Sequence, residues 1–110
     1  MTDRRIVLVL GPHAGEAPLV TADDLVGAST LVVLVIGWPL RPTQERAVQV
    51  AQSLARAAGI VLDAMLVASA DHVAEQITGG DHLVVDGSPR DRRRIRRALA
   101  TRGISAPDAR

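Results

Sequence analysis

The chain of 110 residues has no cysteine, phenylalanine, tyrosine or lysine, and its one large aromatic ring is Trp38. The absence of cysteine excludes disulfides, thiol nucleophiles and thiolate metal ligands, and it suits a reducing compartment. Because there is only one tryptophan, binding that stacks several nucleic-acid bases on aromatic side chains is disfavoured. The hydrophobic core must therefore consist almost entirely of aliphatic side chains.

The chain also lacks a long hydrophobic run. The longest one, residues 31–36, is too short to cross a bilayer. Residues 1–10 lack the longer apolar stretch and the small-residue cleavage site of a secretory signal. We therefore expect a cytoplasmic protein without membrane contact. Its length suits a single domain over residues 1–110, in which residues 103–110 form a flexible tail.

Short apolar runs alternate with amphipathic segments along the chain. Apolar runs that predict strands occupy residues 6–10, 31–36, 60–67 and 82–85. Capping residues and helical periodicity predict helices at residues 21–26, 43–58, 70–77 and 89–102. Residues 31–36 are apolar at every position, which is typical of a central strand covered on both faces. The alternation favours an α/β fold, a three-layer Rossmann-like domain with a mainly parallel sheet of about four strands and flanking helices.

The helix predicted at residues 43–58 has the clearest amphipathic pattern. Its apolar residues, including Ala47, Val50 and Ala51, predict the face that packs on the sheet. Gln44 belongs to the polar face and is expected to point away from the sheet. Gly59 is expected to end the helix.

The order of elements over residues 31–99 resembles that of the universal stress protein family. The resemblance rests on the segments LVVLVIGWP, ERAVQVAQSLARAAG, IVLDAMLV, DHVAEQI and DHLVVDGSPRDRRRIRRAL. It implies a phosphate-binding turn after the last of these strands, and members that bind ATP make a nucleotide a possible cofactor. Two positions depart from the ATP-binding pattern. Gly37-Trp38-Pro39 replaces an acidic residue, and Arg90 stands where the second glycine of the phosphate motif belongs.

The chain ends before the last strand of that family. This leaves a sheet edge without its usual strand. We expect residues 6–10 to fill the vacant edge, which would place them beside residues 82–85.

Positive charge is concentrated near the end of the chain. Six arginines fall within residues 90–97, and residues 88–110 carry eight arginines against two aspartates. The first 87 residues instead carry five arginines against ten acidic residues. An acidic body with a basic last helix predicts an anionic partner or the association of opposite faces of two copies.

The turn before this helix has a clear start signal, with Ser88 as N-cap, Pro89 at the first helical position and Asp91 at the third. We expect Asp86, at the end of a strand, to cap the turn rather than to bind Mg²⁺. An anion held by the free amides of the turn and by guanidinium groups would relieve the repulsion between the arginines. The predicted anion-binding residues are Asp86, Gly87, Ser88, Arg90, Arg92 and Arg93, and the predicted pocket or partner surface comprises Trp38, Arg96 and Arg97.

Catalysis has little support in the sequence. The three histidines, His13, His72 and His82, lack metal-ligand spacing, and His13 with Glu16 is only a weak acid/base pair. We expect a small non-catalytic regulatory or adaptor domain that binds a phosphorylated ligand or a protein partner, which includes a second copy in a homodimer. The alternative is a nucleic-acid-binding protein whose arginine-rich helix contacts phosphates. Acidic groups of the body or of a partner, or solvent ions, would also balance the arginines.

Overall fold

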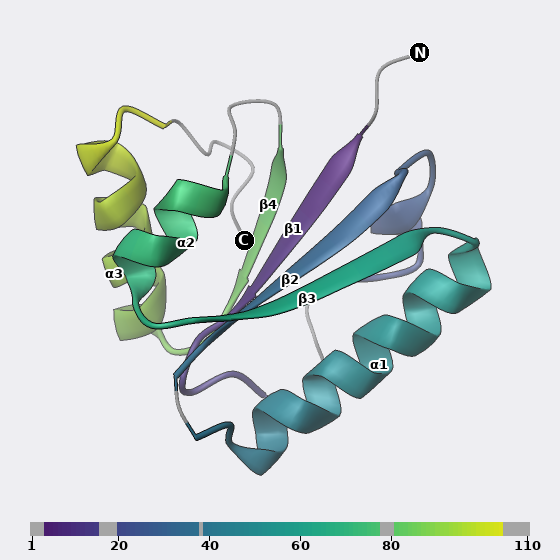
Figure 1. The fold of residues 1–110 in the computed structure, drawn as a ribbon, viewed down its shortest axis with the longest axis horizontal. Coiled ribbons are helices and arrows are strands. Elements are labelled where there is room, and N and C mark those ends of the chain that lie inside the picture. Colours follow the sequence, from purple (N-terminus) through teal and green to yellow (C-terminus); the bar gives the residue numbers. More distant parts are fainter. Residues whose placement is uncertain (1–3, 16–19, 38, 78–80, 105–110) are drawn as a thin grey trace.

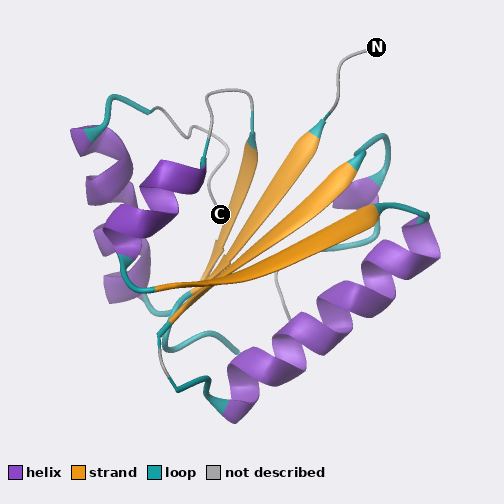
Figure 2. Ribbon diagram, in the orientation of Figure 1, coloured by secondary structure: helices purple, strands orange, loops and turns teal. Residues whose placement is uncertain are grey.

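The computed structural model describes residues 4–15, 20–37, 39–77 and 81–104. Its strands are β1 (Arg5–Leu10), β2 (Thr30–Ile36), β3 (Val61–Val67) and β4 (His82–Asp86). Its helices are the 3₁₀ turn η1 (Asp23–Leu25), α1 (Pro42–Ala58), α2 (Ala70–Gln76) and α3 (Pro89–Thr101). All four strands are parallel, in the order β3-β2-β1-β4 (Figure 2). The predicted Rossmann-like α/β fold is confirmed.

Helices cover both faces of the sheet, and the two faces form two separate cores. On one face Val7 and Val9 of β1 pack with side chains of α2 and α3. On the other face Ile6, Leu8 and Leu10 pack with side chains of α1 and η1. Figure 1 shows α2 and α3 together on one side and α1 on the other. The continuous apolar runs of β1 and β2 are the consequence, because a strand covered on both faces has no solvent side.

The position of residues 6–10 is confirmed in one respect and wrong in another. They do lie beside β4, in a parallel register that pairs Ile6 with His82 and Leu10 with Asp86. They are not an edge strand, however, because β1 also pairs with β2 and so lies in the middle of the sheet. β1 is central because its backbone hydrogen-bonds on both sides, with β2 and with β4, and the side chains of residues 6–10 are fully buried between the helices on the two faces.

The orientation predicted for α1 is also corrected. Gln44 is buried, with 1% of its surface exposed, whereas Val50 is 38% exposed. The buried face is formed by Gln44 with Ala47, Ala51 and Ala55. The Gln44 side chain is buried because its amide group has hydrogen-bond partners at the ends of two strands, Gly11 and Ile36.

The chain reverses its direction across the sheet next to β1. From β1 it runs outward through β2 to β3, and it then crosses to β4 on the other side of β1. The loop after β1 leads to the α1 face, whereas β4 leads to α3 on the opposite face. In open α/β sheets, ligands bind at the carboxyl ends of strands where such a reversal separates two loops. This switch point, between Gly11 and Gly87, is therefore the first place to look for a site.

No helix in the described part of the chain combines the length and the apolar character that crossing a membrane requires.

Candidate functional site

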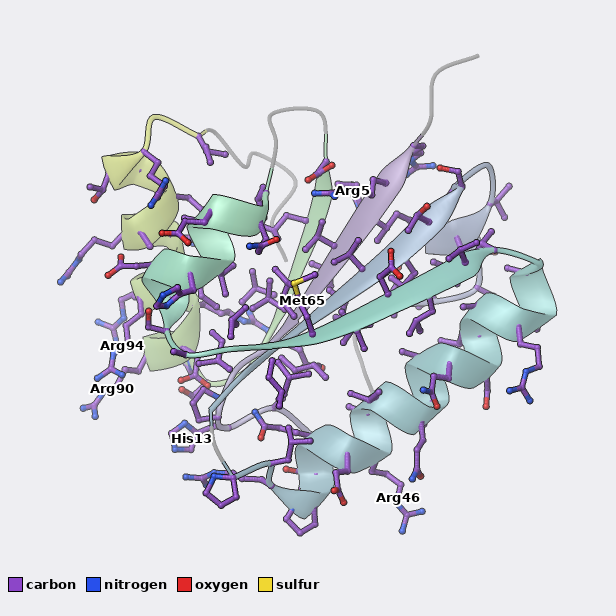
Figure 3. All side chains as sticks on the ribbon, in the orientation of Figure 1. Arg5, His13, Arg46, Met65, Arg90 and Arg94 are labelled. Carbon is purple, nitrogen blue, oxygen red and sulfur yellow. The ribbon has the colours of Figure 1, made fainter. Side chains whose placement is uncertain are left out.

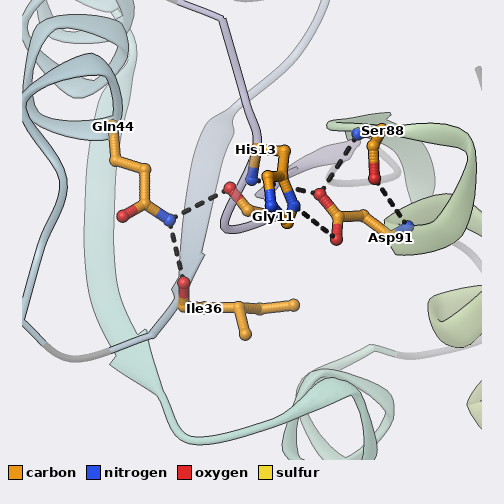
Figure 4. Close-up of polar contacts among 6 residues, drawn as sticks. All are labelled: Gly11, His13, Ile36, Gln44, Ser88 and Asp91. Atoms are coloured by element: carbon orange, nitrogen blue, oxygen red, sulfur yellow. Dashed lines mark hydrogen bonds and ion pairs between the residues drawn. The ribbon is translucent and has the colours of Figure 1, made fainter.

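The switch point between β1 and β4 is occupied by the carboxylate of Asp91, which comes from the first turn of α3. Asp91 Oδ2 accepts hydrogen bonds of 3.1 Å from the backbone N–H groups of His13 and Ser88 (Figure 4). Asp91 is only 4% exposed. Two backbone donors from different loops thus converge on one buried anionic group, as they would on a bound phosphate.

Two glycines make room for this carboxylate. A Cβ atom on Gly11 would lie 2.6 Å from Asp91 Oδ2, and a Cβ atom on Gly87 would lie at the same distance. Both distances are far below van der Waals contact, so a side chain at either position would displace the carboxylate. Gly11 N–H also donates to the carbonyl of Asp86 at 2.8 Å, which ties the two strand ends together.

The start of α3 has the predicted cap, but its amides are not all free. Asp91 N–H donates to Ser88 Oγ at 3.2 Å, and Ser88 N–H donates back to the Asp91 side chain. Pro89 has no N–H. The expectation that the Ser88 amide is available for an external anion is therefore wrong, because the carboxylate three residues later already accepts its hydrogen bond.

His13 lies against this buried carboxylate rather than in an isolated loop. Its Nδ1 atom is 3.4 Å from Asp91 Oδ1, and its side chain is 56% exposed. Glu16, the other half of the weak acid/base pair, lies outside the described residues. His13 also borders an open hollow with Ser88, Pro89, Arg90 and Arg93.

The arginines of α3 fall into two groups. Four of them, which we call the arginine hollow, surround a surface depression of about 270 Å³: Arg90, Arg93, Arg94 and Arg97. Figure 3 shows Arg90 and Arg94 extending from α3 on its outer side. Arg92 is half-buried and Arg96 is exposed, and neither lines this depression. Of the predicted set, Arg90 and Arg93 are thus brought to one depression, and Arg92 is not.

Within the part of the chain that the structure describes, no acidic side chain forms an ion pair with an arginine of the hollow. The ion pairs found among the described residues join Arg5 to Asp81, His13 to Asp91 and Arg102 to Glu75. None of them involves an arginine of the hollow. Arg92 Nε is buried and has no hydrogen-bond acceptor within the described ranges.

A second depression adjoins the hollow at the carboxyl edge of the sheet. This edge cavity of about 230 Å³ is lined by Pro12, Ile36, Gly37, Ala68, Ser69, Ala70, Asp91, Arg94 and Ile95. Most of these residues are apolar, and Arg94 lines both depressions. An apolar cavity and a cationic surface therefore meet at one side chain.

The remaining predicted site residues lie at the end of β4, in the turn after it, or outside the described residues. Asp86 ends β4 and is 7% exposed, and Gly87 and Ser88 form the turn into α3. Trp38 lies outside the described residues. In the described ranges no group of three acidic, histidine or cysteine side chains is arranged to hold a metal ion.

Sequence reasoning missed two residues of this region. Arg94 lies four residues after Arg90 and three before Arg97, and this helical spacing was a sufficient signal for the hollow. Asp91 was recognised only as a cap residue. No local signal revealed its burial, because the His13 loop that covers it is 78 residues away in sequence.

Comparisons of the chain with protein-family models, with curated proteins and with solved structures gave no match. The similarity to universal stress proteins therefore rests on the residues quoted above, and it stays a prediction.

Proposed function

We propose that the protein is a non-catalytic regulatory or adaptor domain that binds a phosphorylated small molecule through the arginine hollow and the edge cavity. One observation carries the proposal. Four guanidinium groups without a carboxylate partner among the described residues surround one hollow, and one of them, Arg94, also lines an apolar cavity where open α/β sheets bind ligands.

The charge distribution of α3 gives the physical reason. Arg90 lies three or four residues before Arg93 and Arg94, and these two lie four and three residues before Arg97. Like charges at such a spacing destabilise a helix by about 0.2–0.5 kcal/mol per pair. Arg90 also lies in the first turn, where the helix dipole disfavours a cation. A phosphate dianion removes both penalties and accepts paired, charge-assisted hydrogen bonds from guanidinium groups.

The buried Asp91 directs where the phosphate goes. Its carboxylate already accepts the backbone donors of the switch point, so the phosphate is held by arginine side chains instead. The apolar lining of the edge cavity, including Ile36 and Ile95, suits the non-phosphate part of the ligand. A cavity of about 230 Å³ is smaller than a typical ligand pocket of about 300–1,000 Å³, so part of the ligand stays in solvent.

Thermal unfolding with a panel of nucleotides and sugar phosphates tests the proposal. A ligand that binds the native state raises the melting temperature by mass action. We expect at least one phosphorylated compound to do so, and we expect Arg93→Ala with Arg97→Ala to raise its Kd at least about tenfold, because charged hydrogen bonds contribute about 1.5–3 kcal/mol each.

The control variant is Arg46→Ala with Arg56→Ala. It removes two exposed arginines from α1, on the opposite face of the sheet, and so makes the same change in net charge. Its Kd should match that of the unchanged protein. No stabilisation by any compound of the panel, or equal losses in the two double variants, would contradict the proposal.

The alternative function, nucleic-acid binding, is favoured by the exposure of Arg96, which lies beyond the hollow, next to the exposed Arg97 of the hollow. It predicts binding of DNA or RNA that weakens steeply with salt and that requires the same arginines. Binding to a mixed-sequence oligonucleotide measured at two salt concentrations separates this alternative from the small-molecule site.

A further inference from the structure

The outer edge of β3 is an apolar strand without a neighbour. β3 ends the sheet on one side, and no strand of the described residues lies beyond it (Figure 1). Val61 is 62% exposed, Leu66 50% and Met65 38%. These are three of the five large hydrophobic side chains that are exposed in the described part, the others being Val26 and Val50. Among the described residues, exposed apolar surface is thus concentrated on β3, one of the two edge strands of the sheet.

The direction of the β3 backbone groups follows from its contacts with β2. Val61 N–H donates to the carbonyl of Ser29, and the carbonyl of Val67 accepts from Gly37 N–H. Residues 61 and 67 therefore face β2. Because backbone groups alternate in direction along a strand, Leu62, Ala64 and Leu66 direct their N–H and C=O groups to the open edge. An edge of this kind is a template for another strand.

The sequence of β3 is almost the same read in either direction. VLDAMLV has valine at both ends, leucine next to both ends and Ala64 in the centre. Only Asp63 and Met65 break the symmetry. A strand that pairs with its own copy in antiparallel orientation about Ala64 therefore places like residues opposite each other. Val61 meets the other Val67, and Leu62 meets the other Leu66.

We propose that β3 forms a two-fold antiparallel pair with β3 of a second copy of this chain, centred on Ala64, so that the two sheets join into one. The three outward-facing residues of each copy then lie opposite one another as hydrogen-bonded pairs. This register makes up to about six hydrogen bonds between the copies. It also satisfies both requirements of a two-fold interface, because the same surface is used twice and is complementary to itself.

The exposed hydrophobic residues gain cross-strand neighbours on both faces of the joined sheet. Met65 projects on the α2 side of β3 (Figure 3), and the alternation of the strand places Leu66 on the α1 side. The two Ala64 side chains meet at the axis, where their small size avoids a clash. β3 contains no proline, and its pairing with β2 is regular from Val61 to Val67. It therefore lacks the bulges and prolines that block pairing at an edge.

Asp63 is the one charge on the strand, and it weakens the pair without preventing it. In the proposed register each Asp63 lies opposite the other Met65, and the two Asp63 residues are diagonal neighbours about 7–8 Å apart. Arg5 offsets part of this repulsion, because its positive charge attracts the carboxylate of Asp63. The pKa of Arg5 is raised, chiefly by its hydrogen bond to Asp81 and further by the charge of Asp63. Removing the Asp63 charge should therefore strengthen the association.

Disulfide trapping tests both the interface and its register. The chain has no cysteine, so a single Ala64→Cys substitution introduces the only thiol. Hydrogen-bonded residues in antiparallel strands have Cα atoms about 5.5 Å apart, within the range that a disulfide spans. We expect mild oxidation to convert Ala64→Cys into a covalent dimer at least about tenfold faster than Val26→Cys, which places an exposed thiol directly after η1. Equal rates would overturn the proposal.

Sedimentation of the unmodified chain and two further variants tests the backbone pairing. The chain should sediment as a dimer in a concentration-dependent equilibrium. Ala64→Pro removes an outward N–H that β2 does not use, so the fold should persist while the Kd of the dimer rises at least about tenfold. Asp63→Asn should lower that Kd. A monomer at every concentration, or a dimer whose Kd neither variant changes, would overturn the proposal.

Discussion

At the scale of single residues, the most informative feature is the buried carboxylate of Asp91. It accepts two backbone hydrogen bonds at the switch point, where related architectures hold the anionic part of a ligand. The protein thus supplies an internal anion that bridges the β1 loop and the start of α3. This arrangement depends on the absence of a side chain at Gly11 and Gly87.

We expect Gly11→Ala to destabilise the protein by about 1–3 kcal/mol, because the new methyl group overlaps the side chain of the buried Asp91. Urea unfolding measures the free energy. Gly15→Ala is the matched control, because Gly15 is in the same loop and a Cβ there has nothing within 4 Å. A loss in Gly11→Ala no greater than in Gly15→Ala would show that Asp91 can move aside at little cost.

At the scale of elements, α1 shows why helical periodicity alone misplaces a face. Hydrophobicity favoured Val50 inside and Gln44 outside, and the structure has the opposite. Gln44 Nε2 donates to the carbonyls of Gly11 and Ile36 at 3.0 and 2.8 Å (Figure 4). Gln44 Oε1 accepts from Arg41 N–H at 3.0 Å. These acceptors belong to strand ends, so the pattern of the helix itself contains no sign of them.

Gln44→Leu should therefore lower the free energy of unfolding by about 1–3 kcal/mol, because two carbonyl groups at the strand ends lose their donor. Gln52→Leu makes the same chemical change at an exposed position of α1 and should change stability by less than about 0.5 kcal/mol. Both values come from urea unfolding followed by circular dichroism. Similar losses in the two variants would mean that the Gln44 hydrogen bonds contribute little.

At the scale of the whole molecule, the two proposed surfaces belong to different edges of the sheet. β3 is one edge and β4 is the other, and α3 packs against β4 and α2. The open strand is apolar, whereas the arginine hollow is cationic. Association through β3 therefore leaves the hollow exposed in both copies.

This separation predicts that the two activities are independent. Ala64→Pro should weaken the dimer and leave the Kd for the phosphorylated ligand unchanged within about twofold, because variants of distant sites act additively. Arg93→Ala with Arg97→Ala should do the reverse. Sedimentation gives the Kd of the dimer and ligand titration gives the Kd of the ligand, each for both variants. A loss of dimer in the arginine variant would instead place the interface on α3.

The amino-acid sequence by itself determined the alternation of strands and helices, the parallel α/β class, the cap of α3 and the excess of arginine on that helix. Each of these features depends on residues that are close together in the sequence and that form a periodic pattern, a capping pair or a run of charge. Only the tertiary structure decided that β1 is central, that Asp91 and Gln44 are buried, and that the open backbone of β3 belongs to Leu62, Ala64 and Leu66. These facts depend on contacts between segments far apart in the chain, and such contacts leave no periodic trace in either segment.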